Sequence, residues 1–462
     1  MKARIIPYIM AMLLGLNLSM SGCGEDRWAA YATQTATDRW IDDTMRVWYY
    51  WAKEMPESKN LNYFQAPATF FKSLLYSSDK FSSIDSLNVT TSNRSIGSTN
   101  YSYGMEYSVT KVNDTAYYAH VLYTVVDSPA EEAGLQRGDW VMSFNGVPLT
   151  KQNYTALLGG SAAEIVVGRY DAEQKQVVAV DDNPRHLSEA RSIDDNPVYC
   201  VKVFDVNATR VGYLAYNHFT PGATYSATAQ GSATNYDDAL RQASTQLAAA
   251  GIDELVLDLR YNNGGYVSCA QLLATLLAPA SALGQPMATL EYNAHFQPVE
   301  ILLDASRIGQ GTNLDLKRLF VLTTGETASA SEMVMNCLKP YMDVVQIGTT
   351  TVGKNMGARS FDNVEQMVSI TPMICKIYNA LGESDYDKGF SPTNTALIVD
   401  ENKFLANFFP LGTPDEALLS TALSYIAGET ESVVATRSMQ HSKSETIVTS
   451  LQRRATKGVM LK

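Results

Sequence analysis

The sequence predicts an α/β domain, with a mixed sheet between flanking helices, that follows a β-rich domain and a helical cap. Near-continuous apolar runs of strand length at 254–260 and 320–322 alternate with segments of helical periodicity, a pattern typical of a sheet that helices cover on both faces. Short alternating segments with turn residues occupy 102–180. Because the chain has 462 residues, it has room for two or three domains.

The first 22 residues have the pattern of a signal peptide. Lys2 and Arg4 precede an apolar stretch at 5–18, and small residues then lead to Cys23. Residues 20–23 resemble the lipobox of bacterial lipoproteins, which implies that Cys23 is lipidated and attaches the protein to a membrane. We therefore expect a lipoprotein of the bacterial cell envelope, on the outer membrane and facing the periplasm or the cell surface. Plain secretion with an incidental cysteine is the alternative.

Residues 23–92 comprise the anchored N-terminus and a helical cap. Trp40, Met45 and Trp48 recur on one helical face, and Pro67 opens a later apolar segment. An aromatic stripe of this kind is typical of core packing. We expect no chemistry from the cap itself.

Residues 102–181 form the β-rich domain. The segment 127–141 and the turn at Asn145 and Gly146 look like a PDZ domain of the bacterial protease type. The resemblance implies that Tyr103, Gly104 and Met105 form the loop whose N–H groups hold a peptide's C-terminal carboxylate, beside a strand to which that peptide adds. The partner would be the C-terminal peptide of a polypeptide substrate. A domain that serves only as scaffold is the alternative.

A polar stretch at 181–196 suggests a linker, after which residues 197–428 form the α/β domain. An amphipathic helix is expected at 237–250, before the strand at 254–260. Gly264 and Gly265 follow that strand and precede an apolar helix at 267–277. Paired glycines at such a junction allow close backbone approach and present N–H groups outward.

The most informative stretch is 320–354, which predicts a buried strand, a sharp turn and a helix start, and then a second strand at 344–348. Ser329 stands at the turn, where free backbone N–H groups of the helix converge and could stabilise an oxyanion. Lys354 follows the second strand and could serve as the base that a serine nucleophile needs. The spacing of Ser329 and Glu332 is also that of a capping box, a purely structural alternative.

Residues 327–354 resemble the carboxyl-terminal processing peptidases, the tail-specific serine proteases of the S41 type with a Ser–Lys dyad. The pattern S-A-S-A-S-E is nearly reproduced around Ser329, and G-K is reproduced at Lys354. The family's D-L-R-x-N-P-G-G corresponds to residues 258–265, with Asn263 in place of the proline. The resemblance implies a ClpP/crotonase-like core, Ser329 as nucleophile and Lys354 as base. It also implies an oxyanion hole from an N–H of Gly264 or Gly265 together with that of Ala330.

One residue departs from the family pattern. Members commonly place a glutamine four residues after the lysine to orient its amine, whereas this chain has Ala358 there. Asn355 or a backbone carbonyl would have to take over that role. His218, at the end of the domain's first strand, is the competing base.

Charge and composition exclude other classes of function. A net charge of −12 disfavours binding to nucleic acid through a basic face. The histidines, and the four cysteines after Cys23, show no metal-ligand spacing, so neither metal nor other cofactor is expected. Residues 429–462 form a polar tail, expected to be mobile or a loosely docked helix. The sequence thus predicts a cell-envelope serine endopeptidase that cleaves unfolded or C-terminally exposed proteins. A catalytically weak or inactive peptide-binding lipoprotein that retains the protease fold is the alternative.

Overall fold

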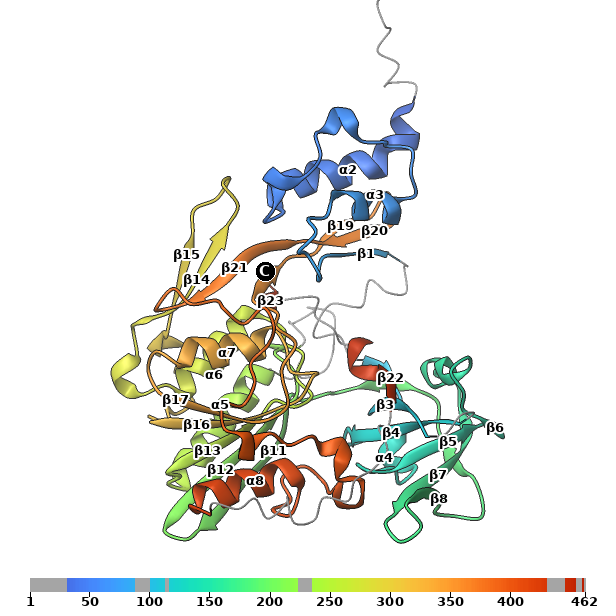
Figure 1. Ribbon diagram of the computed structural model, residues 1–462, viewed down its shortest axis with the longest axis vertical. Coiled ribbons are helices and arrows are strands. Elements are labelled where there is room, and N and C mark those ends of the chain that lie inside the picture. The colour runs from blue at the N-terminus through green and yellow to red at the C-terminus, as the bar shows by residue number, and fades with distance from the viewer. Residues whose placement is uncertain are drawn as a thin grey trace, which may run out of the picture.

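The computed structural model describes residues 31–87, 100–112, 116–222, 235–429, 445–453 and 459–460. The predicted signal peptide and Cys23 lie outside these residues. Figure 1 shows the cap, the PDZ-like domain and the α/β domain as three separate parts of the molecule. No helix within the described ranges is both long and apolar enough to span a bilayer.

The cap is built on two helices that pack against a small sheet. Its core combines Met45, Phe70 and Phe71 with Ile370, which belongs to the α/β domain. The cap therefore shares a core with the α/β domain, although the PDZ-like domain lies between them in the sequence. Its elements are α2 (Ala32–Trp48), η2 (Ala52–Glu54), η3 (Ser58–Asn60), α3 (Pro67–Leu74) and β1 (Ser83–Ser86), and β1 pairs antiparallel with β20 (Val368–Thr371).

The PDZ-like domain is a twisted sheet in the order β22-β3-β4-β5-β7-β8, where β22 is Glu445–Thr449, with β6 beside β5 and β9 beside β7. Residues 181–196, expected to be a linker, contain β9 and β10, which hydrogen-bond to β7 and β2. The elements are β2 (Asn100–Ser102), β3 (Met105–Lys111), β4 (Tyr117–Thr124), α4 (Pro129–Glu132), β5 (Trp140–Phe144), β6 (Val147–Pro148), η4 (Tyr154–Leu158), β7 (Ala163–Asp171), β8 (Gln176–Ala179), β9 (Arg185–Leu187) and β10 (Arg191–Ile193).

The central sheet of the α/β domain has the order β11-β12-β13-β16-β17. Its last four strands are parallel, and β11 is antiparallel to β12. The elements up to β17 are β11 (Val198–Val206), β12 (Thr209–Tyr216), α5 (Tyr236–Ala249), β13 (Glu254–Asp258), α6 (Val267–Leu277), η5 (Ala280–Ala282), β14 (Pro286–Tyr292), β15 (Val299–Leu302), η6 (Ala305–Ile308), β16 (Arg318–Thr323), α7 (Ala330–Leu338) and β17 (Asp343–Gly348).

Alternate residues of these strands enter two cores, one on each face of the sheet. Leu257 and Val321 pack with α5, α6 and α7, whereas Val256 and Phe320 pack with α8 (Ala417–Ile426) on the opposite face. Burial on both faces explains why these strands read as continuous apolar runs. The later elements are β18 (Met356–Ala358), β19 (Phe361–Asn363), β20, β21 (Met373–Asn379), η7 (Thr395–Leu397), η8 (Glu401–Lys403), η9 (Leu405–Asn407) and α8 (Ala417–Ile426).

The described part of the C-terminal tail is not a single docked helix but two strands, with a short 3₁₀ helix after the first. It consists of β22 (Glu445–Thr449), η11 (Ser450–Arg453) and β23 (Val459–Met460). β22 pairs with β3 of the PDZ-like domain, and β23 pairs with β18 of the α/β domain. The tail takes strand conformation because two existing sheet edges supply its hydrogen bonds (Figure 1).

Candidate active site

Three loops meet beyond the carboxyl ends of β13, β16 and β17. Backbone hydrogen bonds join them: Ala328 N–H donates to Asn262 O at 3.1 Å, and Val352 N–H donates to the carbonyl of Thr327 at 3.0 Å. Parallel strands deliver their following loops to one edge of a sheet. The structure thus brings the glycine pair, Ser329 and the segment that ends at Lys354 to one place.

Ser329 immediately precedes α7 and is fully buried. Its backbone has φ +62° and ψ −112°, an unusual conformation for a residue with a side chain and one that surrounding contacts must hold. The Ser329 Oγ has no hydrogen-bond partner among the described residues. The Ser329 N–H does donate to the Glu332 carboxylate, so these two residues form the capping pair of the structural alternative, but the hydroxyl itself makes no capping hydrogen bond.

The glycine pair lies directly against Ser329. A Cβ placed on Gly264, which has φ +106°, would lie 2.7 Å from the Ser329 Cβ and 3.0 Å from Ala330 N. A Cβ on Gly265 would lie 2.1 Å from the carbonyl oxygen of Phe219. Both positions consequently require glycine: a side chain at Gly264 would push the loop away from the serine, and one at Gly265 would clash with the Phe219 backbone.

The N–H groups of this pair differ in their partners. The Gly264 N–H donates to the Asn262 Oδ1 at 2.9 Å. Within the described ranges, the N–H groups of Gly265 and Ala330 have no acceptor. Of the three predicted oxyanion-hole residues, Gly265 and Ala330 thus have backbone N–H groups that are free to bind an oxyanion. The Gly264 N–H is engaged, and the lack of a side chain at Gly264 leaves room for Ser329.

Glu332 joins the serine to the lysine segment. One of its carboxylate oxygens accepts from the N–H groups of Ser329 and Lys354, each at 2.8 Å. The other accepts from Thr351 Oγ1 at 2.5 Å and Gly353 N–H at 2.6 Å. Burial raises the pKa of Glu332 above its ordinary value, although these four hydrogen bonds favour the ionised form.

Lys354 is buried, with 6% of its surface exposed. Its Nζ lies 5.0 Å from the ring centre of Phe81, a residue of the cap. Phe81 also packs against an apolar cluster that contains Ala358 and Met356. An aromatic ring from the cap thus lies beside the lysine, close to the position where family members commonly have the orienting glutamine.

The other sequence-predicted candidates for the base and its support lie elsewhere. The Asn355 side-chain amide donates to Ser384 O at 2.7 Å, so its nitrogen is already engaged there. The His218 Nε2 lies 3.0 Å from the backbone oxygen of Asp195 and 3.7 Å from its carboxylate. The imidazole is thereby held by the segment that joins the two domains.

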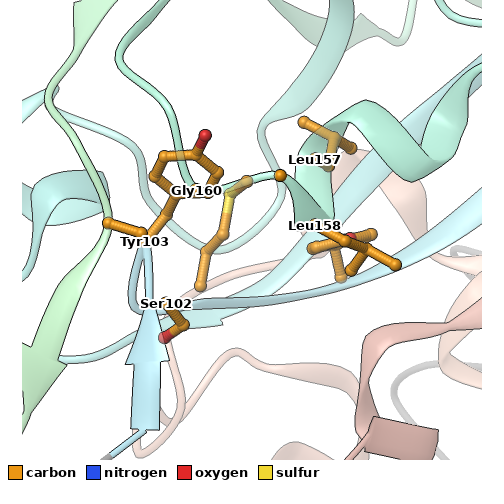
Figure 2. Close-up of a pocket in the computed structure, with 9 residues that line it drawn as sticks. Ser102, Tyr103, Leu157, Leu158 and Gly160 are labelled. Carbon is orange, nitrogen blue, oxygen red and sulfur yellow. The ribbon is translucent and has the colours of Figure 1, made fainter. Parts of the chain in front are cut away.

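The predicted carboxylate loop borders a small pocket between β3 and η4 (Figure 2). The Tyr103 hydroxyl donates to Ser161 O at 2.5 Å, and the Gly104 N–H donates to the Ser102 Oγ at 3.1 Å. Gly104 has φ +73° and leaves no room for a side chain beside Ser128. The pocket is lined by Ser102, Tyr103, Met105, Tyr107, Leu157, Leu158, Gly159, Gly160 and Ala190.

A buried ionic network connects the PDZ-like domain to the glycine loop. The Arg137 guanidinium donates to Glu401 at 2.8 Å and also contacts the Tyr261 hydroxyl. Arg260 bridges Glu416 at 2.5 Å and Glu401 at 3.0 Å. For both glutamates, burial alone would raise the pKa, but the two arginines outweigh it and hold the pKa below its ordinary value.

Sequence reasoning missed the roles of Glu332, Phe81 and Arg137. The capping-box spacing signalled only that Glu332 contacts the Ser329 backbone. Arg137 was visible in the L-Q-R-G-D motif of the PDZ resemblance, without a partner. Nothing in the sequence relates Phe81 to Lys354, because their contact depends on how the cap folds onto β18 and β21.

Comparisons with known proteins agree with this architecture. A sequence model of peptidase family S41 matches residues 210–395, one of the S41 N-terminal domain matches 36–83, and one of the PDZ domain matches 120–167. The carboxyl-terminal-processing protease of Synechocystis sp. is 23% identical over 69% of this chain and 67% of its own length. That of Picosynechococcus sp. is 26% identical over 53% of each chain. The chain thus spans about half to two thirds of these curated relatives.

One solved structure matches most of both chains. The crystal structure of a protein assigned as an S41 protease from Bacteroides fragilis is 39% identical, covering 85% of this chain and 98% of that one, with a TM-score of 0.75. The predicted fold, an α/β peptidase core with a PDZ domain and an N-terminal helical region, is confirmed. This chain belongs to peptidase family S41, whose curated members matched here are carboxyl-terminal-processing proteases.

Proposed function

We propose that this protein is a serine endopeptidase with a Ser329–Lys354 dyad. The observation that supports it most is the Glu332 carboxylate, which binds the backbone of both residues at 2.8 Å. One rigid group thereby fixes the relative position of nucleophile and base. The adjacent N–H groups of Gly265 and Ala330, without an acceptor in the described part of the chain, are free to hold an oxyanion. The Ser329 Oγ has no partner among the described residues, so in the proposal its hydrogen bond to the Lys354 amine forms when substrate binds.

The reaction follows from these roles. The Ser329 Oγ attacks the peptide carbonyl while its proton passes to the neutral Lys354 amine, and the negative oxygen is held by the Gly265 and Ala330 N–H groups. The C–N bond then breaks as Lys354 returns the proton to the leaving nitrogen. Water, deprotonated by the same amine, releases the acyl group and restores the serine.

The substrates in this proposal are unfolded or C-terminally exposed polypeptides. The PDZ-like domain would take the substrate's C-terminal peptide by strand addition, with the carboxylate at the loop of Tyr103, Gly104 and Met105. Lipidation of Cys23 would keep the enzyme at the cell envelope, on the outer membrane. A Cys23→Ser variant should then leave the membrane fraction, and unchanged membrane partitioning would contradict the anchor.

One observation favours the alternative, a peptide-binding lipoprotein with weak or no activity. Ala358 lies in an apolar cluster, so its side chain offers no hydrogen bond to orient Lys354. The two functions can be distinguished because only the peptidase yields cleavage products. A soluble form of the protein should cleave an unfolded protein into fragments detectable by mass spectrometry, and Ser329→Ala and Lys354→Met should each abolish cleavage.

The matched control for the base is His218→Ala, which should retain most activity because the imidazole is held by Asp195. An active Lys354→Met with an inactive His218→Ala would show that the dyad is wrong. Equal fragment patterns for the wild type and Ser329→Ala would remove the peptidase and leave the binding function.

Glu332→Gln tests whether the Glu332 carboxylate positions Ser329 relative to Lys354. An amide keeps the shape but can accept hydrogen bonds at only one of its two polar atoms, so either the serine or the lysine segment is released. Since a misplacement of about 1 Å can cost on the order of 100-fold in rate, kcat should fall about 10- to 100-fold. An unchanged kcat would mean that the carboxylate only caps the helix.

A further inference from the structure

The C-terminal tail occupies the edge strand of the PDZ-like domain. Without β22, β3 would be the outer strand of the sheet, with its hydrogen-bonding groups unpaired. β22 lies antiparallel along it, from Glu445 beside Lys111 to Thr449 beside Ser108. An edge can pair with one strand at a time, so a peptide that adds to this part of β3 must exclude β22.

The tail also runs in the direction that a captured peptide would take. The predicted carboxylate loop immediately precedes β3, so a peptide held there would lie antiparallel to β3 with its C-terminal end toward Met105. β22 has the same orientation, since its C-terminal end is the one nearer to Tyr107. The tail therefore mimics the geometry of a bound C-terminal peptide.

Side-chain contacts continue the interaction beyond the strand. The Tyr107 N–H donates to the Ser450 Oγ at 2.8 Å, and that hydroxyl donates to the Glu106 carboxylate. Leu451 is fully buried in a cluster with Leu122, Tyr123 and Phe408. Its carbonyl accepts from the Asn263 side chain at 2.8 Å. Asn263 directly precedes Gly264, so the tail contacts the loop that lies against Ser329.

We propose that the segment 445–451 is an intramolecular ligand of the PDZ-like domain, which the C-terminal peptide of a polypeptide substrate must displace. The identity of the competitor rests on the proposed function. Displacement removes the hydrogen bond from Asn263 to Leu451 and frees the loop next to Ser329. Binding of a substrate to the PDZ-like domain is thereby coupled to the conformation of the loop in the candidate active site.

The pocket beside the loop lets a substrate compete with a tethered segment. The tail turns toward Asn263 after Ser450, and none of the pocket-lining residues belongs to it. A substrate with a free C-terminal carboxylate can fill this pocket and gain contacts that the tail does not make. A segment that itself binds with an affinity of about 100 μM, and is tethered at an effective concentration on the order of 1 mM, weakens the binding of a competing peptide roughly tenfold.

Binding measurements on the inactive Ser329→Ala background test the proposal without dependence on catalysis. The probe is a fluorescent peptide with the sequence of residues 445–451 and a free carboxylate, followed by anisotropy. A chain that stops at Ser444 should bind it about tenfold more tightly than the full chain. A full-length Leu451→Asp variant should show the same gain, because a charge cannot occupy the buried Leu451 site.

The matched control is Leu381→Asp, the same substitution at a side chain that is 68% exposed and distant in sequence from the tail. It should bind the probe like the unmodified full chain. Equal affinity for the full and shortened chains would overturn the proposal, and so would absence of binding to either. An inactive wild-type enzyme would instead contradict only the proposed peptidase function, since binding is measured without cleavage.

Discussion

Two connections link the PDZ-like domain to the loop of residues 260–265, and they differ in kind. One is the buried ionic network, in which Arg137 meets Tyr261 and Glu401. The other is the tail, whose Leu451 accepts a hydrogen bond from Asn263. They reach residues only two positions apart on the same loop. The first joins two domains through charges, and the second through one strand and one apolar side chain.

This difference indicates which connection a bound peptide can replace. Separating Arg137 from its carboxylates would leave charges buried without partners, which is expensive in a protein interior. Releasing β22 exposes one strand edge and one leucine, and a substrate peptide can replace both sets of contacts. We therefore interpret the ionic network as the permanent joint and the tail as the exchangeable one.

The largest effect is expected from Arg137→Met. Removal of the guanidinium leaves Glu401 and Glu416 with Arg260 as their remaining cation in the network, so unfolding free energy should fall by about 3–5 kcal/mol. Denaturant unfolding measures this. Arg191→Met, which breaks an exposed pair with Glu132, should leave the midpoint unchanged. Equal midpoints for both variants would show that the network is not the permanent joint.

His120 makes the same joint sensitive to acid. It stacks on Trp140 at 4.1 Å and contacts Phe408 of the α/β domain. Burial, with a contribution from the Arg137 charge, lowers the pKa of His120 from 6.5 to about 3. The unfolded chain thus binds a proton below about pH 6.5, whereas the folded chain binds it only below about pH 3. Between these values the protein therefore loses stability as the pH is lowered.

His120→Phe should remove that loss. The ring keeps its stacking position, and no hydrogen bond is sacrificed, because the His120 Nε2 has no partner among the described residues. Relative to pH 7, the variant should retain about 2 kcal/mol more of its stability at pH 5 than the wild type does. The measurement is denaturant unfolding at both pH values. Parallel losses in the two proteins would show that the imidazole does not stay neutral in the folded state.

Tyr261→Phe is expected to lower the free energy of unfolding less than Arg137→Met does. The Tyr261 hydroxyl donates to Glu401 at 2.6 Å and accepts from Arg137. Its removal leaves the ionic pairs intact but costs one charged hydrogen bond, about 1.5–3 kcal/mol. Thermal unfolding would detect it. A loss as large as that of Arg137→Met would place the strength of the joint in the tyrosine rather than in the ion pairs.

The sequence was sufficient to predict the central sheet and the place of the site. β13, β16 and β17 are buried on both faces, so their apolar runs are visible without a structure, and parallel strands send their loops to one edge. This is why Gly264 and Ser329 could be predicted to meet. Their roles in catalysis, and that of Lys354, stay predictions.

The remainder depends on contacts between distant segments. The strand at 445–449 is short and has a partner more than 300 residues earlier, so local periodicity gave no sign of it, and a mobile tail or a helix was expected. The second oxygen of Glu332 reaches Thr351 and Gly353 only because β17 lies beside β16. Such contacts follow from the tertiary fold and not from spacing.

Leu451→Ala should have the smallest effect on global stability, and it separates the two connections most sharply. A fully buried leucine in a domain core costs about 2–5 kcal/mol when it is truncated to alanine. In an exchangeable tail the loss cannot exceed the free energy of tail docking, because the rest of the protein stays folded when the tail leaves. The midpoint of denaturant unfolding should therefore change little, while hydrogen exchange of the β22 amides becomes faster and that of the β13 amides does not. If instead the midpoint falls as it does for a core leucine, with β13 and β22 exchanging together, the tail is an integral part of the fold and only the substrate's own affinity governs access to β3.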